Sequence, residues 1–373
     1  MLQVLRWASG FSFWAAFFAA AASAQPVVAP GDPPRGVSMR TVPERVCLVE
    51  RTPSYLNFDL LIRNSTSAEL VIEEVRGLLL DRSGHVLERR IIWQQSLSAL
   101  APARAIPANG EAVIFNPILF HALRPGVHVR MEVQFRGAAH GAAPLSLVVE
   151  PVACVNRQEL RLPVAGRVLV HDGYDIFSHH RRSTYTGAQM VALGLTDNFQ
   201  RYGLDFVVVD EQGRFYRGAG TRNEDWLGWG RPVRATGSGT VVSVHNDQPD
   251  NEVVGTIDRW TDRDLRRNPM SSYGNYVLID HGGGEFSVVG HLRAGSVRVR
   301  RGQRVSIGDE IAQIGNSGAS GGVHVHYERR TGPGIVGIRT LPPYFRGLTV
   351  VGTGDRGGRT GVPVDSGDIL IAR

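Results

Sequence analysis

Short apolar stretches recur along almost the whole chain and are separated by glycine, proline and asparagine. In the first half they occupy residues 56–62, 70–80, 86–93 and 127–135, and the turn at 81–85 joins two of them as a hairpin. Runs of this length, many with a period of two, predict β-strands, because successive strand side chains point to opposite faces. The sequence therefore predicts an all-β fold.

The domain organisation follows from length and from changes along the chain. The sequence has 373 residues, 42% of them hydrophobic and 20% charged, which suits a globular protein of two domains. We predict a flexible lead at 25–40 and an immunoglobulin-like β-sandwich at 41–155. A glycine-rich second β-sheet domain is expected at 164–340. The tail at 341–373 is expected to pack on it as edge strands, and 247–267 to form a long surface insertion.

The N-terminal residues have the pattern of a targeting segment. Arg6 precedes an apolar run at 7–22, and Ala22, Ser23 and Ala24 supply a small-residue cleavage site. This predicts a signal peptide at 1–24 and an exported protein, periplasmic or associated with the cell wall. An uncleaved membrane anchor is the alternative, although the run is short for a full span. After cleavage no stable membrane span is expected.

Cys47 and Cys154 bracket the first half of the exported chain. In an oxidising compartment they are candidates for one disulfide that closes a loop of roughly 100 residues. The alternative is a pair of buried free thiols. Their spacing predicts no metal site.

The charge excludes some functions. All 41 basic residues are arginine, none is lysine, and the sequence pI is about 9.7. Such a surface favours anionic surroundings such as the cell wall, but dispersed arginines form no nucleic-acid motif. Without lysine the chain has no Schiff-base chemistry, and it cannot carry biotin or lipoate even though residues 299–315 resemble such carrier domains.

Two histidines separated by one residue point to a metal site. His324 and His326 lie in an alternating apolar stretch, so a strand would present both on one face. Histidine is the commonest zinc ligand, and a catalytic zinc uses about three protein ligands with one open position. On its own the pattern also fits two polar residues on a half-exposed strand.

Four motifs in fixed order surround this pair and carry a family resemblance. They are Gly274-Asn275-Tyr276-Val277-Leu278-Ile279-Asp280-His281-Gly282, Gly290-His291-Leu292, the glycine-punctuated stretch 299–318, and Gly322-Val323-His324-Val325-His326-Tyr327-Glu328. The series, with its surroundings from about residue 164 to 330, resembles the lysostaphin/LytM-type zinc endopeptidases, peptidase family M23. The resemblance implies a LytM-type β-sheet with its site in a groove.

The resemblance also implies the site residues. Asp205 and His326 would bind Zn²⁺, and His291 and His324 would act on the water or the oxyanion. The chain departs from the family pattern His-x-Gly-x-Asp, because Arg201 occupies the histidine position. A protonated guanidinium has no lone pair for a metal. We expect Arg201 instead to face the groove and pair with a carboxylate of the substrate.

The missing ligand has a candidate upstream, in the pair His179 and His180. A branch of the family carries a similar His-His-Arg-Arg stretch, which matches residues 179–182 here. We select His180, while His179 stays open because neighbouring residues on a strand point in opposite directions. The alternative is a surface His-Arg cluster that contacts anionic substrate.

These observations support two functions from different classes. The first is a zinc endopeptidase that hydrolyses peptide cross-links of peptidoglycan. The second is a catalytically inactive LytM-type protein that binds wall material or regulates another hydrolase. Retention of Asp205, His324 and His326 favours the first.

Overall fold

The computed structural model describes residues 32–49, 54–115, 118–136, 143–176, 178–352 and 361–372. The predicted signal peptide at 1–24 lies outside these residues. Strand makes up 41% of the structure and helix 8%, which confirms the all-β class. Within the described ranges, no helix is both long and apolar enough to span a bilayer.

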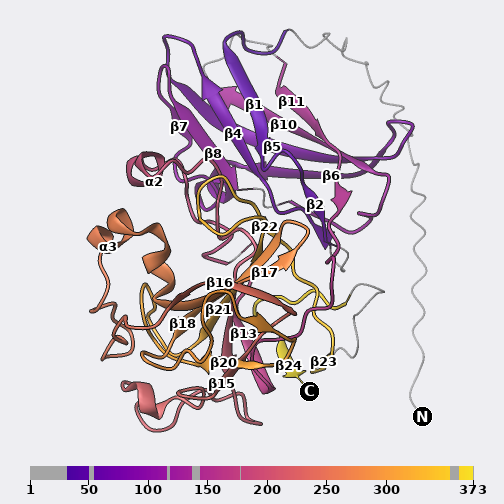
Figure 1. The fold of residues 1–373 in the computed structure, drawn as a ribbon. Helices are drawn as coiled ribbons and strands as arrows, with labels where there is room; N and C mark the ends of the chain where they lie inside the picture. The colour runs from indigo at the N-terminus through magenta and orange to yellow at the C-terminus, as the bar shows by residue number, and fades with distance from the viewer. Residues whose placement is uncertain are drawn as a thin grey trace, which may run out of the picture.

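Two antiparallel sheets form the N-terminal domain, at the top of Figure 1. The first sheet has the order β1 (Val37–Val42), β4 (Asp59–Asn64) and β8 (Glu111–Phe115). The second has the order β11 (Leu145–Val149), β10 (His128–Arg136), β5 (Leu70–Leu80) and β6 (Val86–Trp93), with β7 (Ala105–Ile106) also paired to β5. Smaller elements are α1 (Gln94–Ser98) and the pair β3 (Ser54–Tyr55) and β9 (Leu119–Phe120).

Alternating apolar side chains of both sheets meet in one core. Leu60 and Ile114 of the first sheet belong to the same buried cluster as Val75 and Met131 of the second. The layers are therefore those of a β-sandwich, whose immunoglobulin-like character stays a prediction. β1 begins at Val37, inside the range expected to be a flexible lead, because pairing with β4 satisfies its backbone.

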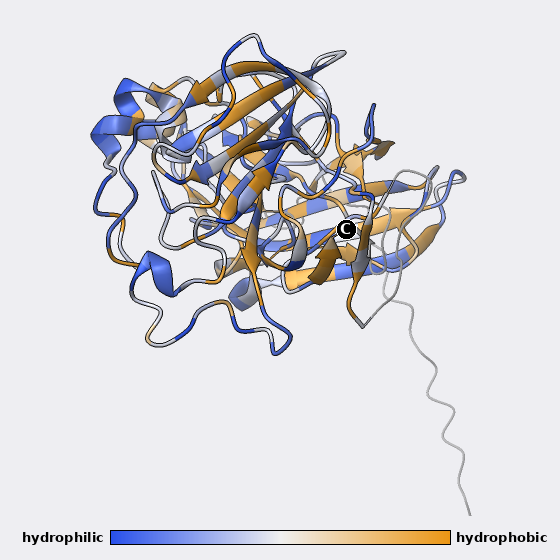
Figure 2. Ribbon diagram, turned by 60° about the horizontal axis from the view of Figure 1, so that its bottom comes forward, coloured by the Kyte–Doolittle hydropathy of each residue, from blue (hydrophilic) through white to orange (hydrophobic). Residues whose placement is uncertain are grey.

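One long sheet forms the second domain. Its order is β19 (Arg304–Val305), β16 (Gly239–His245), β17 (Asn275–Gly282), β18 (Glu285–Leu292), β21 (Val325–Arg330), β14 (Leu204–Val208), β13 (Gly166–Asp172), β24 (Ile369–Ala372) and β23 (Leu348–Val350), with β22 (Thr340–Leu341) on β21. A separate pair joins β15 (Pro232–Arg234) to β20 (Glu310–Gln313). Figure 2 shows hydrophobic residues concentrated in the strands of both domains and hydrophilic ones in most loops.

The tail and the insertion agree with their predictions only in part, although most residues of 247–267 are exposed. β23 ends the long sheet, but β24 lies inside it between β13 and β23, so only part of the tail is an edge. The range 247–267, expected at the surface, includes the fully buried Asn251 as well as the helix α3 (Asp262–Arg267). The remaining helical elements are α2 (Ala188–Ala192), η1 (Asn223–Asp225) and η2 (Pro269–Tyr273).

A disulfide and an apolar cluster lie where the two domains meet. Cys47 in β2 (Cys47–Leu48) is bonded to Cys154, which follows the parallel strand β12 (Val152–Ala153). Both sulfurs belong to the core cluster of the second domain. A further cluster combines Leu61 and Phe115 of the sandwich with residues of the second domain such as Phe199. The sandwich is thus packed directly against the sheet domain.

Candidate metal centre and active site

Strand register brings the candidate ligands together in the centre of the long sheet. β14 pairs with β21 so that Asp205 lies opposite His326, and β13 pairs with β14 so that Asp172 lies opposite Asp205. His324 immediately precedes β21, and β18 pairs with β21 on the other side and carries His291 near its end. Five histidine and aspartate side chains from four segments therefore face one site.

Histidine nitrogens converge on one oxygen of Asp205. His180 Nε2 lies 3.6 Å from Asp205 Oδ1, and His326 Nδ1 lies 2.9 Å from the same atom. Ligand atoms of a tetrahedral zinc, each at about 2.0–2.1 Å from the metal, lie roughly 3.3–3.5 Å apart. The two distances lie on either side of this spacing, and the three buried donors, two imidazoles and one carboxylate, are of the kind that zinc binds. His180, Asp205 and His326 are thus the residues that would hold it.

The two neighbouring histidines differ in burial and in direction. The side chain of His180 is 2% exposed and its Nε2 faces Asp205, whereas the side chain of His179 is 69% exposed. Both place Nδ1 near Asp172 Oδ2, at 3.0 Å for His180 and 2.7 Å for His179. His179 also belongs to a group with Asp172, His180 and Asp205 whose potential ligand atoms lie within 4.8 Å of one another. Burial and direction favour His180 as the ligand.

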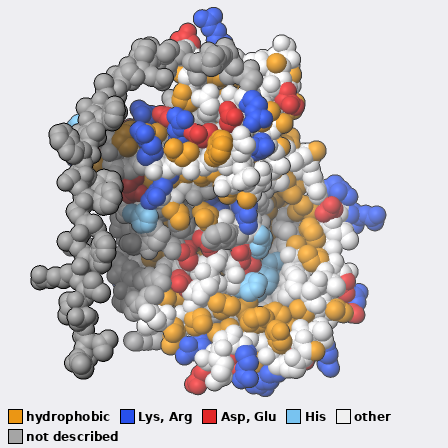
Figure 3. All heavy atoms as spheres, turned by 180° about the vertical axis from the view of Figure 1, so that it is seen from behind, with side chains coloured by type: hydrophobic (Ala, Val, Ile, Leu, Met, Phe, Trp, Pro, Cys, Tyr) orange, Lys and Arg blue, Asp and Glu red, His pale blue; other side chains and the backbone are white. Residues whose placement is uncertain are grey.

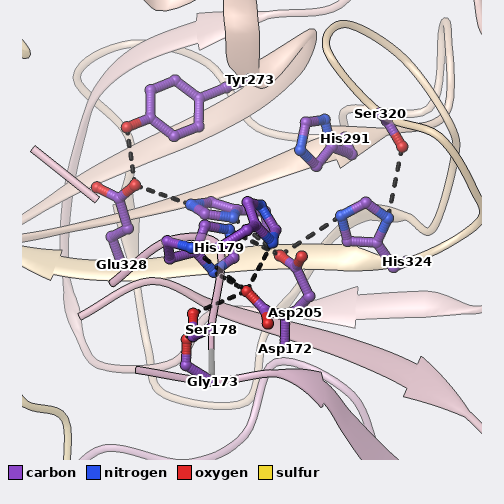
Figure 4. A network of polar contacts seen from close by, with 12 residues as sticks. Asp172, Gly173, Ser178, His179, Asp205, Tyr273, His291, Ser320, His324 and Glu328 are labelled. Carbon is purple, nitrogen blue, oxygen red and sulfur yellow. Dashed lines mark hydrogen bonds and ion pairs between the residues drawn. The ribbon is translucent and has the colours of Figure 1, made fainter. Parts of the chain in front are cut away.

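In each candidate histidine ligand, the ring nitrogen that faces away from Asp205 contacts a second carboxylate. Asp172 contacts Nδ1 of His180 and leaves Nε2 toward Asp205. Glu328 accepts a hydrogen bond from His326 Nε2 at 2.8 Å and another from the hydroxyl of Tyr273 at 2.9 Å, which leaves His326 Nδ1 toward Asp205. Metal-binding histidines commonly use such partners to fix ring orientation. Figure 4 shows Asp172, Glu328 and Tyr273 around the site.

His291 and His324 are held by backbone carbonyls. His291 Nδ1 lies 2.8 Å from the carbonyl oxygen of Ser317, and His324 Nδ1 lies 2.8 Å from that of Gly322. A carbonyl only accepts hydrogen bonds, so each Nδ1 carries a proton, and in the neutral form of either ring the lone pair lies on Nε2. His324 Nε2 is 3.4 Å from Asp205 Oδ1, and the rings of His291 and His324 lie 4.7 Å apart. Both are placed as proton acceptors beside the donor set (Figure 4).

His291 also has an unusual backbone conformation. Its φ is +57°, in the left-handed region that side chains other than glycine seldom adopt. Such conformations persist where the surrounding structure imposes them and are concentrated at functional sites. The conformation supports a role for His291 at the site.

Electrostatics favour a cation at this position. Burial disfavours the charged form of Asp205, yet the charges of His180 and His324, with hydrogen bonds from His324 and His326, hold the pKa of Asp205 well below its usual value. Burial lowers the pKa of His180 and of His291, so both are neutral at pH 7. Burial also opposes protonation of His326, but hydrogen bonds to Asp205 and Glu328 outweigh it and raise the pKa of His326 to about 9. His326 must therefore release a proton when a metal binds.

Arg201 does not face the groove, contrary to the expectation from the sequence. Its side chain is 1% exposed and its Nη2 donates to Asp59 Oδ2 at 2.7 Å and to Asp197 Oδ1 at 2.6 Å. Asp59 belongs to the sandwich, so the guanidinium is neutralised inside the protein. Arg201 is therefore not available to bind an anionic substrate.

The histidines line a groove that is open on one side. The cavity has a volume of about 440 Å³, and Gln200, Trp226, Ser272 and Tyr273 line it together with the five residues selected from the sequence. Figure 3 shows histidine side chains gathered next to acidic ones near the middle of this face. A polypeptide segment has room to approach the donor set there.

The structure adds three residues to the site that were not selected from the sequence: Asp172, Glu328 and Tyr273. Asp172 ends a strand and precedes His179 without any motif, so only the register of β13 and β14 reveals it. Glu328 had a signal, because it lies two residues after His326 on the same strand face. Tyr273 donates to Glu328 and also lines the cavity, and no motif marks it in the sequence.

The sheet and the donor set first define a class: a β-sheet protein whose groove holds two histidines and an aspartate in the manner of metal-dependent hydrolases. Residues 227–336 match the model of Peptidase family M23. This match confirms the resemblance of the motifs to that family over this segment. The segment contains His291, His324 and His326, whereas His180 and Asp205 precede it.

The known proteins described next are similar to this chain over only part of its length. The peptidoglycan DD-endopeptidase ShyA of Vibrio cholerae serotype O1 is 33% identical over 99 residues, which are 26% of this chain and 17% of that protein. The chain thus matches far less than two thirds of the length of this relative. A zinc-containing peptidase structure from Vibrio cholerae is 16% identical, covers 56% of this chain and 83% of that one, and has a TM-score of 0.19. The catalytic domain of lysostaphin from Staphylococcus simulans is 18% identical, with coverages of 39% and 79% and a TM-score of 0.24.

Proposed function

We propose that this chain is an exported zinc endopeptidase that hydrolyses peptide cross-links of peptidoglycan. The observation that carries the proposal is the convergence of His180, Asp205 and His326 beside two further histidines, His291 and His324, in one open groove. The M23 match and the relative described as a peptidoglycan DD-endopeptidase support the reaction and the substrate class. The arginine-rich composition suits an anionic cell wall.

The residues of the groove divide the chemistry between them. His180, Asp205 and His326 would hold a zinc ion, which would supply polarisation of the scissile carbonyl and a lowered pKa of bound water. The lone pair on Nε2 of His324 or His291 can accept the proton of the attacking water. The same imidazole, once protonated, can donate that proton to the leaving amine nitrogen or to the oxyanion.

Supporting carboxylates keep these roles apart. Asp172 and Glu328 hold His180 and His326 with one ring nitrogen toward Asp205, so these two rings serve as ligands. His291 and His324 are held by carbonyls through Nδ1, so Nε2 is the ring atom that can accept or donate a proton during a turnover.

Metal content and hydrolysis of purified sacculi test the proposal together. We expect one zinc per chain in the metal-replete protein and release of soluble peptide-linked fragments from sacculi. Asp205→Ala, His326→Ala and His180→Ala should each lose the metal and the activity, because two ligands do not close a zinc site. His179→Ala is the matched control and should keep the metal, since its ring is largely exposed.

Each contrary outcome has a definite meaning. A metal-replete parent protein without zinc would contradict the enzyme and favour the inactive, regulatory LytM-type protein. Full zinc in His180→Ala with loss in His179→Ala would exchange the two assignments. Full zinc in both variants would exclude the replacement of the family ligand by this pair.

A further inference from the structure

One buried carboxylate of the sandwich reaches the segments that carry two candidate ligands. Asp59 in β4 is fully buried, its Oδ1 accepts a hydrogen bond from Arg181 Nη1 at 2.6 Å, and its Oδ2 accepts one from Arg201 Nη2 at 2.7 Å. Each guanidinium is 1% exposed. With Asp197, which also accepts from Arg201, two cations face two anions away from solvent.

Both arginines lie close in sequence to candidate ligands. Arg181 follows His180 directly, and Arg201 lies in the loop that leads to Asp205. The two segments are also tied to each other, because Asn198 Nδ2 donates to the carbonyl of His180 at 2.7 Å. Asp59 thus holds both segments at once.

The loop after Arg201 packs closely against the rings of His180 and His326. A Cβ added at Gly203 would come within 3.0 Å of His180 Cγ and 3.1 Å of His326 Cε1. A second contact from the sandwich fixes this loop, since Asn57 Nδ2 donates to the carbonyl of Arg201 at 2.7 Å. A small shift of the loop would therefore move the rings relative to Asp205.

We propose that Asp59 is a positioning residue for the metal site, and that the sandwich completes this site by bridging Arg181 and Arg201. The inference rests on the proposed zinc site. It assigns the N-terminal domain a part in metal binding and gives Arg201 a function other than substrate contact. The apolar cluster between the domains, with Leu61 and Phe115 on the sandwich side, keeps the bridge away from water.

Zinc affinity of the full chain tests the proposal, measured by competition with a chelator of known affinity. Asp59→Asn removes the bridge, and we expect a zinc affinity about 10- to 100-fold lower, the scale for residues that support a ligand. Arg181→Met cuts the same bridge next to His180 and leaves Asp59 paired with Arg201, so it provides a folded variant if Asp59→Asn is unstable. We expect the same loss in Arg181→Met.

Glu285→Gln is the matched control for a purely structural effect. Glu285 is also buried and forms a two-point ion pair with Arg329, but neither residue contacts His180 or Asp205. Unfolding of the metal-free proteins should show lower stability in all three variants, while Glu285→Gln keeps the parental zinc affinity within about twofold. Parental affinity in folded Arg181→Met or Asp59→Asn would overturn the proposal. A parent chain that binds no zinc would instead refute the proposed function on which it rests.

Discussion

At the scale of single residues, hydrogen-bond partners separate histidines that are alike in sequence. His180 and His326 are backed by carboxylates and turn one nitrogen toward Asp205, whereas His291 and His324 are backed by carbonyls. His281 contacts the carbonyl of Ser238 and the hydroxyl of Ser287 instead, and it does not line the groove. The hydrogen-bond partners of the rings therefore support the proposed division of the histidines into metal ligands and proton acceptors.

The two carbonyl-backed histidines give the first prediction at this scale. His291→Ala and His324→Ala should keep zinc, because neither is a proposed ligand, but turnover of sacculi should fall by about two to four orders of magnitude, the usual range for a lost general base or oxyanion donor. His281→Gln is the control and should digest sacculi at the parental rate. A parental rate in either alanine variant would show that its proposed catalytic role is wrong.

At the scale of elements, the loop between β20 and β21 depends on a residue from the predicted surface insertion. The side-chain nitrogen of Asn251 donates to the carbonyls of Asn316, Gly318 and Ser320 at 2.9, 3.1 and 2.9 Å. The carbonyl of Ser317 in this loop holds His291, and the loop leads to His324. The insertion therefore supports both proposed proton acceptors.

Loss of this support gives the second prediction. Asn251→Ala should lower the free energy of unfolding by about 1–3 kcal/mol, because buried carbonyls lose their donor. It should also lower turnover while zinc stays bound, since no proposed ligand lies in the loop. Urea unfolding, metal analysis and sacculus digestion check these effects. Glu252→Ala, with a side chain that is 66% exposed, should change none of them, and equal behaviour of the two variants would contradict the role of Asn251.

The same elements show what the sequence could and could not predict. Strands at 70–80 and 86–93 have the predicted bounds, because alternation of apolar side chains is a local property. Asn251 and Asp59 could not be assigned, because a buried polar residue is recognisable only by partners far away in the chain. Arg201 was misplaced for the same reason: a carboxylate of the other domain neutralises it.

At the scale of the whole molecule, an apolar cluster and a charged bridge join the domains, and a disulfide closes the sandwich where the domains meet. Cys47 and Cys154 are separated by 107 positions, so their bond closes a loop that contains nearly the whole sandwich. Of the two states that the sequence leaves open, the structure shows the disulfide.

Removal of this bond gives the third prediction. The double variant Cys47→Ser, Cys154→Ser should lose about 4–5 kcal/mol of unfolding free energy, the value expected from loop entropy at this length. Urea unfolding of the parent with and without a reductant provides the comparison. The reduced parent should match the double variant, and unchanged stability in both would contradict a role for the bond in stabilising the chain.

The chain order of the site has a consequence for the comparison of related sequences. His180 and Asp205 lie upstream of residues 227–336, the segment in which the family is recognised. Two relatives can therefore agree throughout that segment while one keeps all the metal donors and the other has lost two of them. If the proposed site is right, a comparison that aims to separate active from inactive relatives has to include the positions of Asp59, His180 and Asp205 as well as that segment.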